Sequence, residues 1–292
     1  MTLAELIARV EQRLSAAPLF YGHGTDNAHA EAAWLVLRGH GLPFDANLGA
    51  AATDVARIER LAERRIAKRV PVAYLLKEAW LAGQPFYVDE RVIIPRSHIA
   101  ELLPSLGRRP VRRVLDLCTG SGCLAILAAR EFRQAEVDAI DVSPGALAVA
   151  RKNVARHRLG RRVHLKRSDL FATAGGARYD LILANPPYVS AQAMAKLPAE
   201  YGHEPRLALA GGSDGMNLVA RILDEAAAYL EPGGRLVCEV GDGRASVQRR
   251  FRGLKLAWPK PEVFIAERDA LALAANTAGG APARPTRSRA KR

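Results

Sequence analysis

The sequence predicts an α/β protein with a doubly wound, mostly parallel sheet and a small helical domain at its N-terminus. From residue 111 onward, short apolar strands alternate with helices, which is typical of parallel strands joined by crossover helices. Residues 1–75 instead carry apolar positions at helical spacing. Acidic residues and glycines gather at the predicted strand ends, where open α/β sheets bind their ligands. A chain of 292 residues accommodates one large domain and a smaller one.

The N-terminal helical domain is expected to span residues 1–75. Its amphipathic helices are expected over residues 2–16, 27–39 and 53–69. Thr2 followed by Glu5 predicts a capping box, and Thr53 is the expected cap of the third helix. Pro71 is expected to end the helical region. This segment has no metal, nucleophile or glycine-loop pattern, so we interpret it as a substrate-binding domain.

Residues 76–107 are expected to join the two domains. Apolar and polar residues alternate over 78–95, which predicts a β-hairpin or two short strands. Ser97 can cap a linker helix over 98–107. Arg96 follows a proline-stiffened turn, where its guanidinium could hold a carboxylate or stay solvated.

The larger domain is expected to span residues 108–275. Its strands are predicted at residues 111–117, 136–141, 163–167, 180–184, 235–240 and 263–267. Its helices are predicted at residues 123–131, 143–158, 216–230 and 244–252, and Pro232-Gly233-Gly234 is expected to stop the third. Residues 276–292 have the composition of a disordered basic tail.

The formal net charge of +13 favours acidic partners, nucleic acid above all. Five positive charges lie in the last fourteen residues and leave about +8 on the rest; they belong to Arg284, Arg287, Arg289, Lys291 and Arg292. We therefore predict a contact between the tail and nucleic acid, with RNA as the candidate that a binding assay tests. If removal of residues 279–292 left salt-sensitive RNA binding unchanged, this prediction would be wrong.

Cysteine content and hydropathy predict a soluble cytoplasmic protein. Cys118, Cys123 and Cys238 are odd in number and lie in apolar runs, which indicates reduced thiols. Their spacing, without suitably placed histidines, argues against a metal site. No stretch approaches the ~18 consecutive apolar residues that span a bilayer. We expect no membrane association.

One predicted strand, over residues 180–184, runs directly into Asn185-Pro186-Pro187-Tyr188. Two prolines end the strand and fix φ near −65°, and Asn185 is pushed towards an extended conformation. The result is a stiff platform with a carboxamide at one end and an aromatic ring at the other. Such a platform suits gripping a planar group that bears an NH2, and these four residues are the predicted catalytic residues.

A glycine-containing loop follows the first strand of the larger domain. The candidate cofactor residues of this loop are Asp116, Cys118, Thr119, Gly120, Ser121 and Gly122. Asp141 ends the next strand, where a carboxylate can bridge two ribose hydroxyls, and Asp169 follows the third strand, where it suits an adenine amine. A dinucleotide and S-adenosylmethionine both use this layout. An S-adenosylmethionine site wants an acidic residue before the glycines, and Asp116 is there. This cofactor also has no pyrophosphate, so it needs less from the N-terminus of the helix that follows.

With these residues in place, the chain resembles the protein N5-glutamine methyltransferases, which implies a Rossmann-like class I methyltransferase fold. The resemblance covers residues 70–270 through Asn185–Tyr188 and the Asp116–Gly122 loop, in which Cys118 replaces a usual glycine. The segments 86–97 and 197–205 are similar to the branch that acts on large-subunit ribosomal protein L-three. The resemblance therefore implies S-adenosylmethionine as cofactor, also in contact with Asn185, and a glutamine in a ribosomal protein as substrate. It also implies an action during ribosome assembly, with ribosomal RNA as the nucleic acid that the basic tail contacts.

Several alternatives stay open at this stage. Release-factor glutamine methylation and adenine-N6 methylation of DNA or RNA use the same tetrapeptide, the latter on a flipped base. A nicotinamide-dependent dehydrogenase fits the fold but would leave the platform unexplained, and a non-catalytic ribosome-assembly factor would leave the complete site unused. His203 and Glu204 are weak candidates for a general base. The oligomeric state is not predicted.

Overall fold

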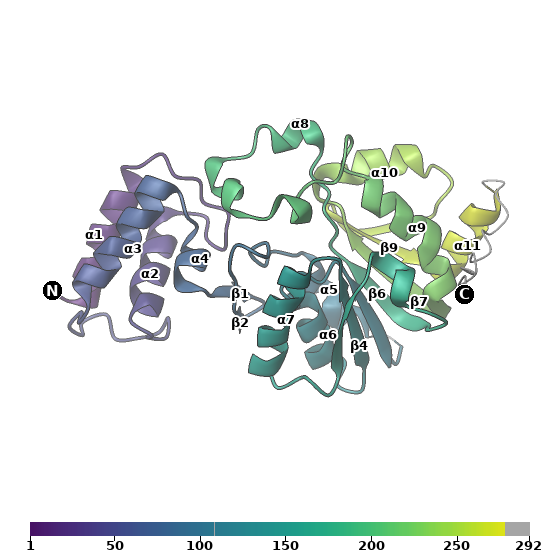
Figure 1. The fold of residues 1–292 in the computed structure, drawn as a ribbon, viewed down its shortest axis with the longest axis horizontal. Helices are drawn as coiled ribbons and strands as arrows, with labels where there is room; N and C mark the ends of the chain where they lie inside the picture. Colours follow the sequence, from purple (N-terminus) through teal and green to yellow (C-terminus); the bar gives the residue numbers. More distant parts are fainter. Residues whose placement is uncertain (108, 278–292) are drawn as a thin grey trace, which may run out of the picture.

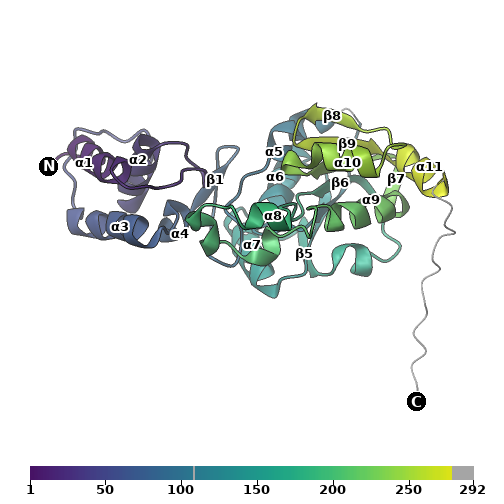
Figure 2. The ribbon, with the colours of Figure 1, turned by 90° about the horizontal axis from the view of Figure 1, so that it is seen from above.

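The computed structural model describes residues 1–107 and 109–277. Helices of the N-terminal region lie at one end of an elongated molecule, and a sheet covered by helices forms the larger body (Figure 1). A view turned by 90° shows the same separation, with the C-terminal strands far from the N-terminus (Figure 2). Within the described ranges, no helix is both long enough and apolar enough to cross a membrane.

The N-terminal region is built from four helices. They are α1 (Leu3–Ser15), α2 (Ala28–Gly39), α3 (Val55–Lys68) and α4 (Val72–Leu76). The predicted capping box of α1 is confirmed, because Thr2 Oγ1 accepts from Glu5 N and Glu5 in turn accepts from Thr2 N. The prediction for Thr53 is wrong: the Asp54 carboxylate caps α3. Pro71 also does not end the helices but begins α4, where its missing N–H costs no helical hydrogen bond.

The linker is less regular than predicted. Its elements are β1 (Ala79–Leu81), β2 (Gln84–Phe86), α5 (Ile99–Leu102) and the 3-10 helix η1 (Leu103–Leu106). The hairpin is confirmed, since β1 and β2 pair antiparallel, but residues 87–95 form no strand. Pro104 lies in the first turn of η1, so the helix predicted over 98–107 is divided in two.

The larger domain contains a seven-stranded sheet in the order β5-β4-β3-β6-β7-β9-β8. Its strands are β3 (Arg113–Leu117), β4 (Glu136–Asp141), β5 (Val163–Arg167), β6 (Tyr179–Ala184), β7 (Leu230–Glu239), β8 (Ala257–Lys260) and β9 (Val263–Glu267). The first five are parallel, and β9 and β8 are antiparallel to their neighbours. The doubly wound, mostly parallel fold is therefore confirmed. The strand order reverses between β3 and β6, and such a switch point is where open sheets bind ligands.

Helices cover both faces of this sheet. They are α6 (Cys123–Glu131), α7 (Pro144–Arg156), α9 (Asn217–Tyr229), α10 (Arg244–Arg250) and α11 (Arg268–Thr277). The short helix α8 (Ala191–Met194) has no buried residue and lies in the segment that follows β6. Short 3-10 helices are η2 (Leu170–Thr173), η3 (Ala199–His203), η4 (Arg206–Ala208) and η5 (Gly241–Gly243). Alternate strand residues pack on opposite faces, because side chains alternate along a strand. Leu181 and Leu183 contribute to the core under α6, and Ile182 and Ala184 to the core under α9.

In the C-terminal part, one expectation is wrong and two elements were not predicted. The Pro232-Gly233-Gly234 segment lies inside β7, which already begins at Leu230, directly after α9. β8 was not predicted, because its four residues include Pro259 and form an edge strand without an apolar run. α11 was also not predicted and extends to Thr277. Apart from its first two residues, the predicted basic tail lies outside the described residues.

The core of the helical domain continues into the larger domain. Buried residues of α1 to α4 share one apolar cluster with Val88, Val92 and Ile94 of the linker and with Ala146 and Val149 of α7. The linker thus packs as part of the interior, and this packing fixes its polar residues near the carboxyl ends of the strands.

Candidate active site

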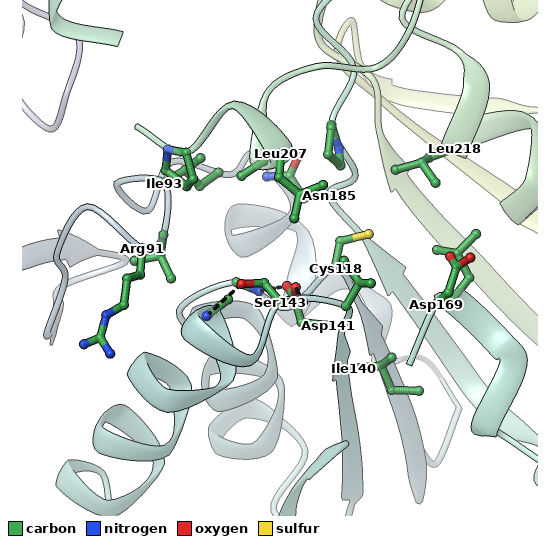
Figure 3. A pocket seen from close by; sticks show the side chains of 18 of the residues that line it. Arg91, Ile93, Cys118, Ile140, Asp141, Ser143, Asp169, Asn185, Leu207 and Leu218 are labelled. Carbon is green, nitrogen blue, oxygen red and sulfur yellow. Dashed lines mark hydrogen bonds between the residues drawn. The ribbon is translucent and has the colours of Figure 1, made fainter. Parts of the chain in front are cut away.

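A cavity of about 280 Å³ lies at the carboxyl ends of β3, β4 and β6 (Figure 3). Of the predicted site residues, those that line it are Cys118, Gly120, Asp141, Asp169, Asn185 and Pro187. Apolar side chains form much of the remaining wall, among them Ile140, Leu207 and Leu218. The structure therefore brings together residues from the ends of four strands, β3, β4, β5 and β6, beside the switch point of the sheet. The volume of the cavity is near the lower end of the range for small-ligand pockets, about 300–1,000 Å³.

Backbone donors hold the Asp141 carboxylate in place. Oδ2 accepts from Gly120 N at 2.9 Å, and Oδ1 accepts from Ser143 N at 2.8 Å. Burial raises the pKa of Asp141 above its usual value, and the hydrogen bonds from the backbone oppose this shift. Each oxygen keeps a second acceptor site, so the carboxylate can receive two hydroxyl groups from a ligand in the cavity.

Several loop residues predicted to contact a cofactor are instead buried behind the cavity wall. Asp116 is fully buried, and its Oδ2 accepts from Thr119 Oγ1 at 2.5 Å and from Ala125 N at 3.1 Å. Ser121 is also buried, and Gly122 has φ of +80° and packs against Ala150 of α7. The described cavity lining includes none of these four predicted residues, Asp116, Thr119, Ser121 and Gly122. In this structure they shape the loop.

Burial of Asp116 predicts a measurable pH dependence of stability. Its Oδ1 has no hydrogen-bond partner among the described residues, and burial raises its pKa from 3.8 to about 7. Because the folded-state pKa is the higher one, this stabilising contribution is complete below pH 3.8 and is lost as pH rises through about 7. We expect Asp116→Asn, which does not titrate, to gain stability relative to wild type between pH 4 and 8. Denaturant unfolding of both proteins across this range measures the difference, and a constant difference would contradict the expectation.

Cys118 adopts a backbone conformation that normally favours glycine. Its φ is +57°, in the left-handed region that glycine adopts most easily. This conformation explains why glycine is usual at this position in the family that the sequence resembles. The side chain lines the cavity, with its sulfur visible in Figure 3. Burial and the nearby acidic residues raise the pKa of the Cys118 thiol, so it remains protonated and serves as an apolar wall.

Asp169 is paired in this structure. Its two carboxylate oxygens accept from Arg221 Nη1 at 3.0 Å and Nη2 at 3.2 Å, and both side chains are largely exposed. An exposed ion pair contributes little stability. The Asp169 carboxylate is therefore available at the cavity rim at little cost.

A second, smaller cavity of about 110 Å³ adjoins the first. It is lined by Arg96, Pro186, Tyr188 and Tyr201, among others. Ile93, Asn185 and Ala208 line both cavities. The predicted tetrapeptide thus lies between two spaces, and Asn185 is the one of its residues that lines both. Figure 3 shows the Asn185 side chain among the residues of the larger cavity.

Tyr188 is held by the segment that follows β7. Its hydroxyl donates to Glu239 Oε1 at 3.4 Å, and a Cβ placed on Gly241 would lie 2.5 Å from the Tyr188 ring. Gly241 has φ of +51°, so both its backbone and its close approach to the ring require glycine. Glu239 is buried and also accepts from Ser97 Oγ at 2.7 Å and His98 N at 3.0 Å. One carboxylate therefore joins the aromatic ring to the linker.

A segment from α8 to η4 covers the smaller cavity and is tied to the helical domain through Glu200. This carboxylate is fully buried. It accepts from Arg65 Nη1 at 3.1 Å, Arg69 Nη2 at 3.1 Å and Phe20 N at 2.9 Å. Burial opposes ionisation, but these donors outweigh it and lower the pKa of Glu200 to about 2.

Glu204, in the same segment, is buried and accepts from Arg96 Nη1 and Nη2, each at 2.6 Å, and from Ile94 N at 2.9 Å. Of the two roles left open for Arg96 by the sequence, holding a carboxylate or staying solvated, the structure shows the first. His23 Nε2 of the helical domain lies 3.8 Å from Glu204 Oε2. Burial would raise the pKa of Glu204, but the hydrogen bonds from Arg96 lower it to about 2. Neither Glu204 nor His203 lines a cavity, and His203 Nε2 instead lies 2.9 Å from Lys68 O.

The comparisons with known proteins agree with this architecture. Residues 99–200 match the family model described as a methyltransferase small domain. Over 276 residues the chain is 49% identical to the ribosomal protein uL3 glutamine methyltransferase of Burkholderia pseudomallei, covering 88% of this chain and 90% of that protein. The chain belongs to this methyltransferase family. Proteins of the same name from Bordetella pertussis and Bradyrhizobium diazoefficiens are 49% and 48% identical, covering 88% of this chain and 90% and 86% of theirs.

Family membership confirms the resemblance to protein glutamine methyltransferases. In this member of the uL3 glutamine methyltransferase family, the two cavities and their surroundings contain residues that the sequence analysis missed. Ile93 and Ala208 line both cavities, Leu207 lines the larger one, and Glu239 holds Tyr188. Only Glu239 had a usable signal, because it is an acidic residue at the end of a predicted strand.

Proposed function

We propose that this protein transfers a methyl group from S-adenosylmethionine to the side-chain amide nitrogen of a glutamine in ribosomal protein uL3. The observation that carries the proposal is the position of Asn185 in the wall of both cavities, so that a donor on one side and an amide on the other meet at its carboxamide. The names of relatives at 46–49% identity favour uL3 as the substrate. Such a substrate implies that the reaction takes place in the cytoplasm.

The larger cavity is the proposed cofactor site. Asp141 would receive the ribose hydroxyls, since both of its oxygens are fixed by the backbone and each keeps a free acceptor site. Asp169 at the rim would accept from the adenine amine, and apolar residues such as Ile140 and Leu218 would cover the base. Bound S-adenosylmethionine supplies a methyl group on a positively charged sulfur. The fit rests on an apolar wall interrupted by two carboxylates.

The smaller cavity is the proposed glutamine site. An amide nitrogen is a weak nucleophile because its lone pair is delocalised into the carbonyl, so catalysis depends on positioning and electrostatics. Asn185 Oδ1 and the Pro186 carbonyl would accept the two N–H bonds of the glutamine and aim its nitrogen at the larger cavity. Pro186 and Pro187 keep this backbone rigid. Tyr188 would wall the amide plane, and Glu239 and Gly241 hold its ring in place.

The proton of the methylated amide must leave without a carboxylate or imidazole in direct contact. The titratable side chains that line the smaller cavity, within the described part of the chain, are Arg96, Tyr188 and Tyr201. Burial and the nearby Glu239 raise the pKa of Tyr188, and Arg96 is held by Glu204. Neither Arg96 nor Tyr188 is a base at neutral pH, because the pKa of each is raised. We propose that solvent takes the proton as the nitrogen–methyl bond forms or afterwards.

Mass spectrometry of ribosomal proteins, from cells with and without this protein, tests the substrate. We expect uL3 to lose the mass of one methyl group in the deletion strain, on a glutamine-containing peptide. Incubation of unmethylated uL3 with the protein and labelled S-adenosylmethionine should restore it. A release factor, DNA and RNA serve as competing acceptors in the same assay. Methylation of one of these, with uL3 left unmodified, would refute the proposed substrate.

A further inference from the structure

A strongly basic segment borders the sheet on the side of β5. Residues 151–167, from the last turns of α7 through β5, contain no Asp or Glu. Their Lys and Arg residues number eight: Arg151, Lys152, Arg156, Arg158, Arg161, Arg162, Lys166 and Arg167. β5 is the edge strand of the seven-stranded sheet, and α7 packs beside it (Figure 2). The segment therefore forms one border of the molecule.

Neighbouring acids neutralise only part of this charge. Arg156 lies 3.6 Å from Glu78, and Lys166 lies 2.8 Å from Asp138. Other cations of the segment contact groups that carry no charge: Arg162 donates to the carbonyls of Phe132 and Ala135, Arg167 to Val142 O, and Lys152 lies 4.0 Å from the centre of the Tyr87 ring.

Three arginines remain unneutralised. Arg151, Arg158 and Arg161 are exposed, and within residues 1–107 and 109–277 none has an acidic partner within ion-pair distance. We call these three, together with Lys152 and Arg167, the α7–β5 basic face. Like charges at this density repel one another, so a face of this kind gains free energy when a polyanion neutralises it.

An ordinary solvated surface looks different in this same molecule. Two acids, Glu59 and Glu63, lie among the cations of α3 and pair with Arg9 and Arg13 of α1. The exposed cations of α3, which are Arg60, Arg64 and Lys68, have no acidic partner within ion-pair distance among the described residues, but unlike those of residues 151–167 they are interspersed with acids. Charges that protect an edge strand from aggregation need to lie on that strand only. Arg151, Arg158 and Arg161 lie on α7 and in the turn before β5, so edge protection does not account for them.

We propose that the α7–β5 basic face binds RNA through its phosphate backbone. The face runs from Arg158 and Arg161, at the beginning of β5, to Arg167 at its end. Five strand residues extend over about 17 Å, which is enough to meet several consecutive phosphates. Arg167 directly precedes Ser168 and Asp169 of the cofactor cavity, so bound RNA would end beside the active site. Arginine suits phosphate because its planar fork donates two parallel hydrogen bonds.

The choice of RNA over another polyanion rests on the proposed function, because a ribosomal protein substrate is built to bind ribosomal RNA. RNA binding needs neither cofactor nor methyl transfer. A failure of the RNA surface is therefore distinguishable from a failure of the proposed methylation, which the mass-spectrometric experiment tests by itself.

The test compares two variants of the full chain with equal loss of charge. The first replaces the exposed arginines of the face, Arg151→Gln, Arg158→Gln and Arg161→Gln. The control replaces exposed cations of α3, Arg60→Gln, Arg64→Gln and Lys68→Gln. A fluorescently labelled RNA hairpin is titrated at about 50 and 200 mM salt, the range over which phosphate contacts weaken strongly. Thermal unfolding and methylation of free uL3 check that each variant is folded.

We expect the first variant to bind RNA on the order of tenfold more weakly at low salt, and to reduce the slope of log K against log salt by about 2, as three lost phosphate contacts imply. The control should bind RNA like wild type within about twofold, and both should methylate free uL3 normally. If both variants lost RNA affinity equally, the loss would be explained by net charge alone, and the proposal would be overturned. Tighter binding of polyglutamate or of duplex DNA than of RNA would overturn it as well.

Discussion

Replacement of Asn185 by alanine is expected to lower kcat/KM for glutamine methylation by about 10²–10³-fold, the loss typical of a single preorganised polar group at a reacting centre. The carboxamide lies in the wall shared by the two cavities, and it is the proposed acceptor for one N–H of the substrate amide. Without it, the substrate nitrogen is free to rotate away from the donor. Initial rates with uL3 and labelled S-adenosylmethionine measure the effect.

Two controls separate this role from general damage. Ser190→Ala removes a side chain five residues later, where Ser190 caps α8 and lines neither cavity, and it should keep near wild-type turnover. Calorimetry with S-adenosylhomocysteine should give Asn185→Ala an affinity within severalfold of wild type. A loss of affinity as large as the loss of rate would place Asn185 on the cofactor and contradict its assignment to the acceptor. Undiminished turnover would contradict any catalytic role.

The second large effect concerns Glu204. Glu204→Gln is expected to lower the free energy of unfolding by about 3–5 kcal/mol, because it leaves the Arg96 guanidinium without its buried partner. The double variant Arg96→Met with Glu204→Leu should recover much of this loss, since it buries no charge. Arg96 and Tyr201 line the proposed glutamine site, so the single variant should also raise KM for uL3. Chemical denaturation and steady-state kinetics measure the two effects.

The same ion pair has a defined pH window. The folded-state pKa of Glu204 is lowered from 4.5 to about 2, so its stabilising contribution is present above pH 4.5 and is lost as pH falls towards 2. The difference in stability between wild type and Glu204→Gln should shrink over that interval. Glu101→Gln is the matched control, because Glu101 forms an exposed pair with Lys260 and should leave the unfolding midpoint unchanged. A pH-independent difference for Glu204→Gln would show that charge is not the cause.

Local patterns made much of the fold and part of the site predictable. Parallel strands end at one edge of a sheet, so the spacing of Asp141, Asp169 and Asn185 along the chain was enough to place them together. Asp116 also lies near a strand end and was expected in the cofactor site for the same reason. Its side chain is instead buried beneath the loop and does not line the cavity. Strand position alone does not determine which way a side chain at the strand end faces. Pro71 shows a similar ambiguity, since proline precedes a helix as readily as it ends one. Pro232 was expected to follow a helix in a turn, but it lies inside β7.

Contacts between distant segments were beyond sequence reasoning. Glu200 meets Arg65 across 135 residues and Phe20 across 180, and Glu239 meets Ser97 across 142. Glu200 follows no periodic pattern and looks like an ordinary surface residue until the tertiary fold buries it. Glu239 stands out as an acid at the end of a predicted strand, but nothing in the sequence pairs it with Ser97. The helical domain was therefore assigned a role only by elimination, although its arginines hold the segment that covers the proposed glutamine site.

The wall shared by the two cavities also matters for the design of inhibitors. Ile93, Asn185 and Ala208 line both cavities, so we expect a compound that joins an adenosine to a primary carboxamide through a short linker to occupy the proposed cofactor and glutamine sites at once. Each half would hold the other at high effective concentration. Selectivity would come from the carboxamide half, because the side chains of Asn185, Pro186 and Tyr188 line its cavity.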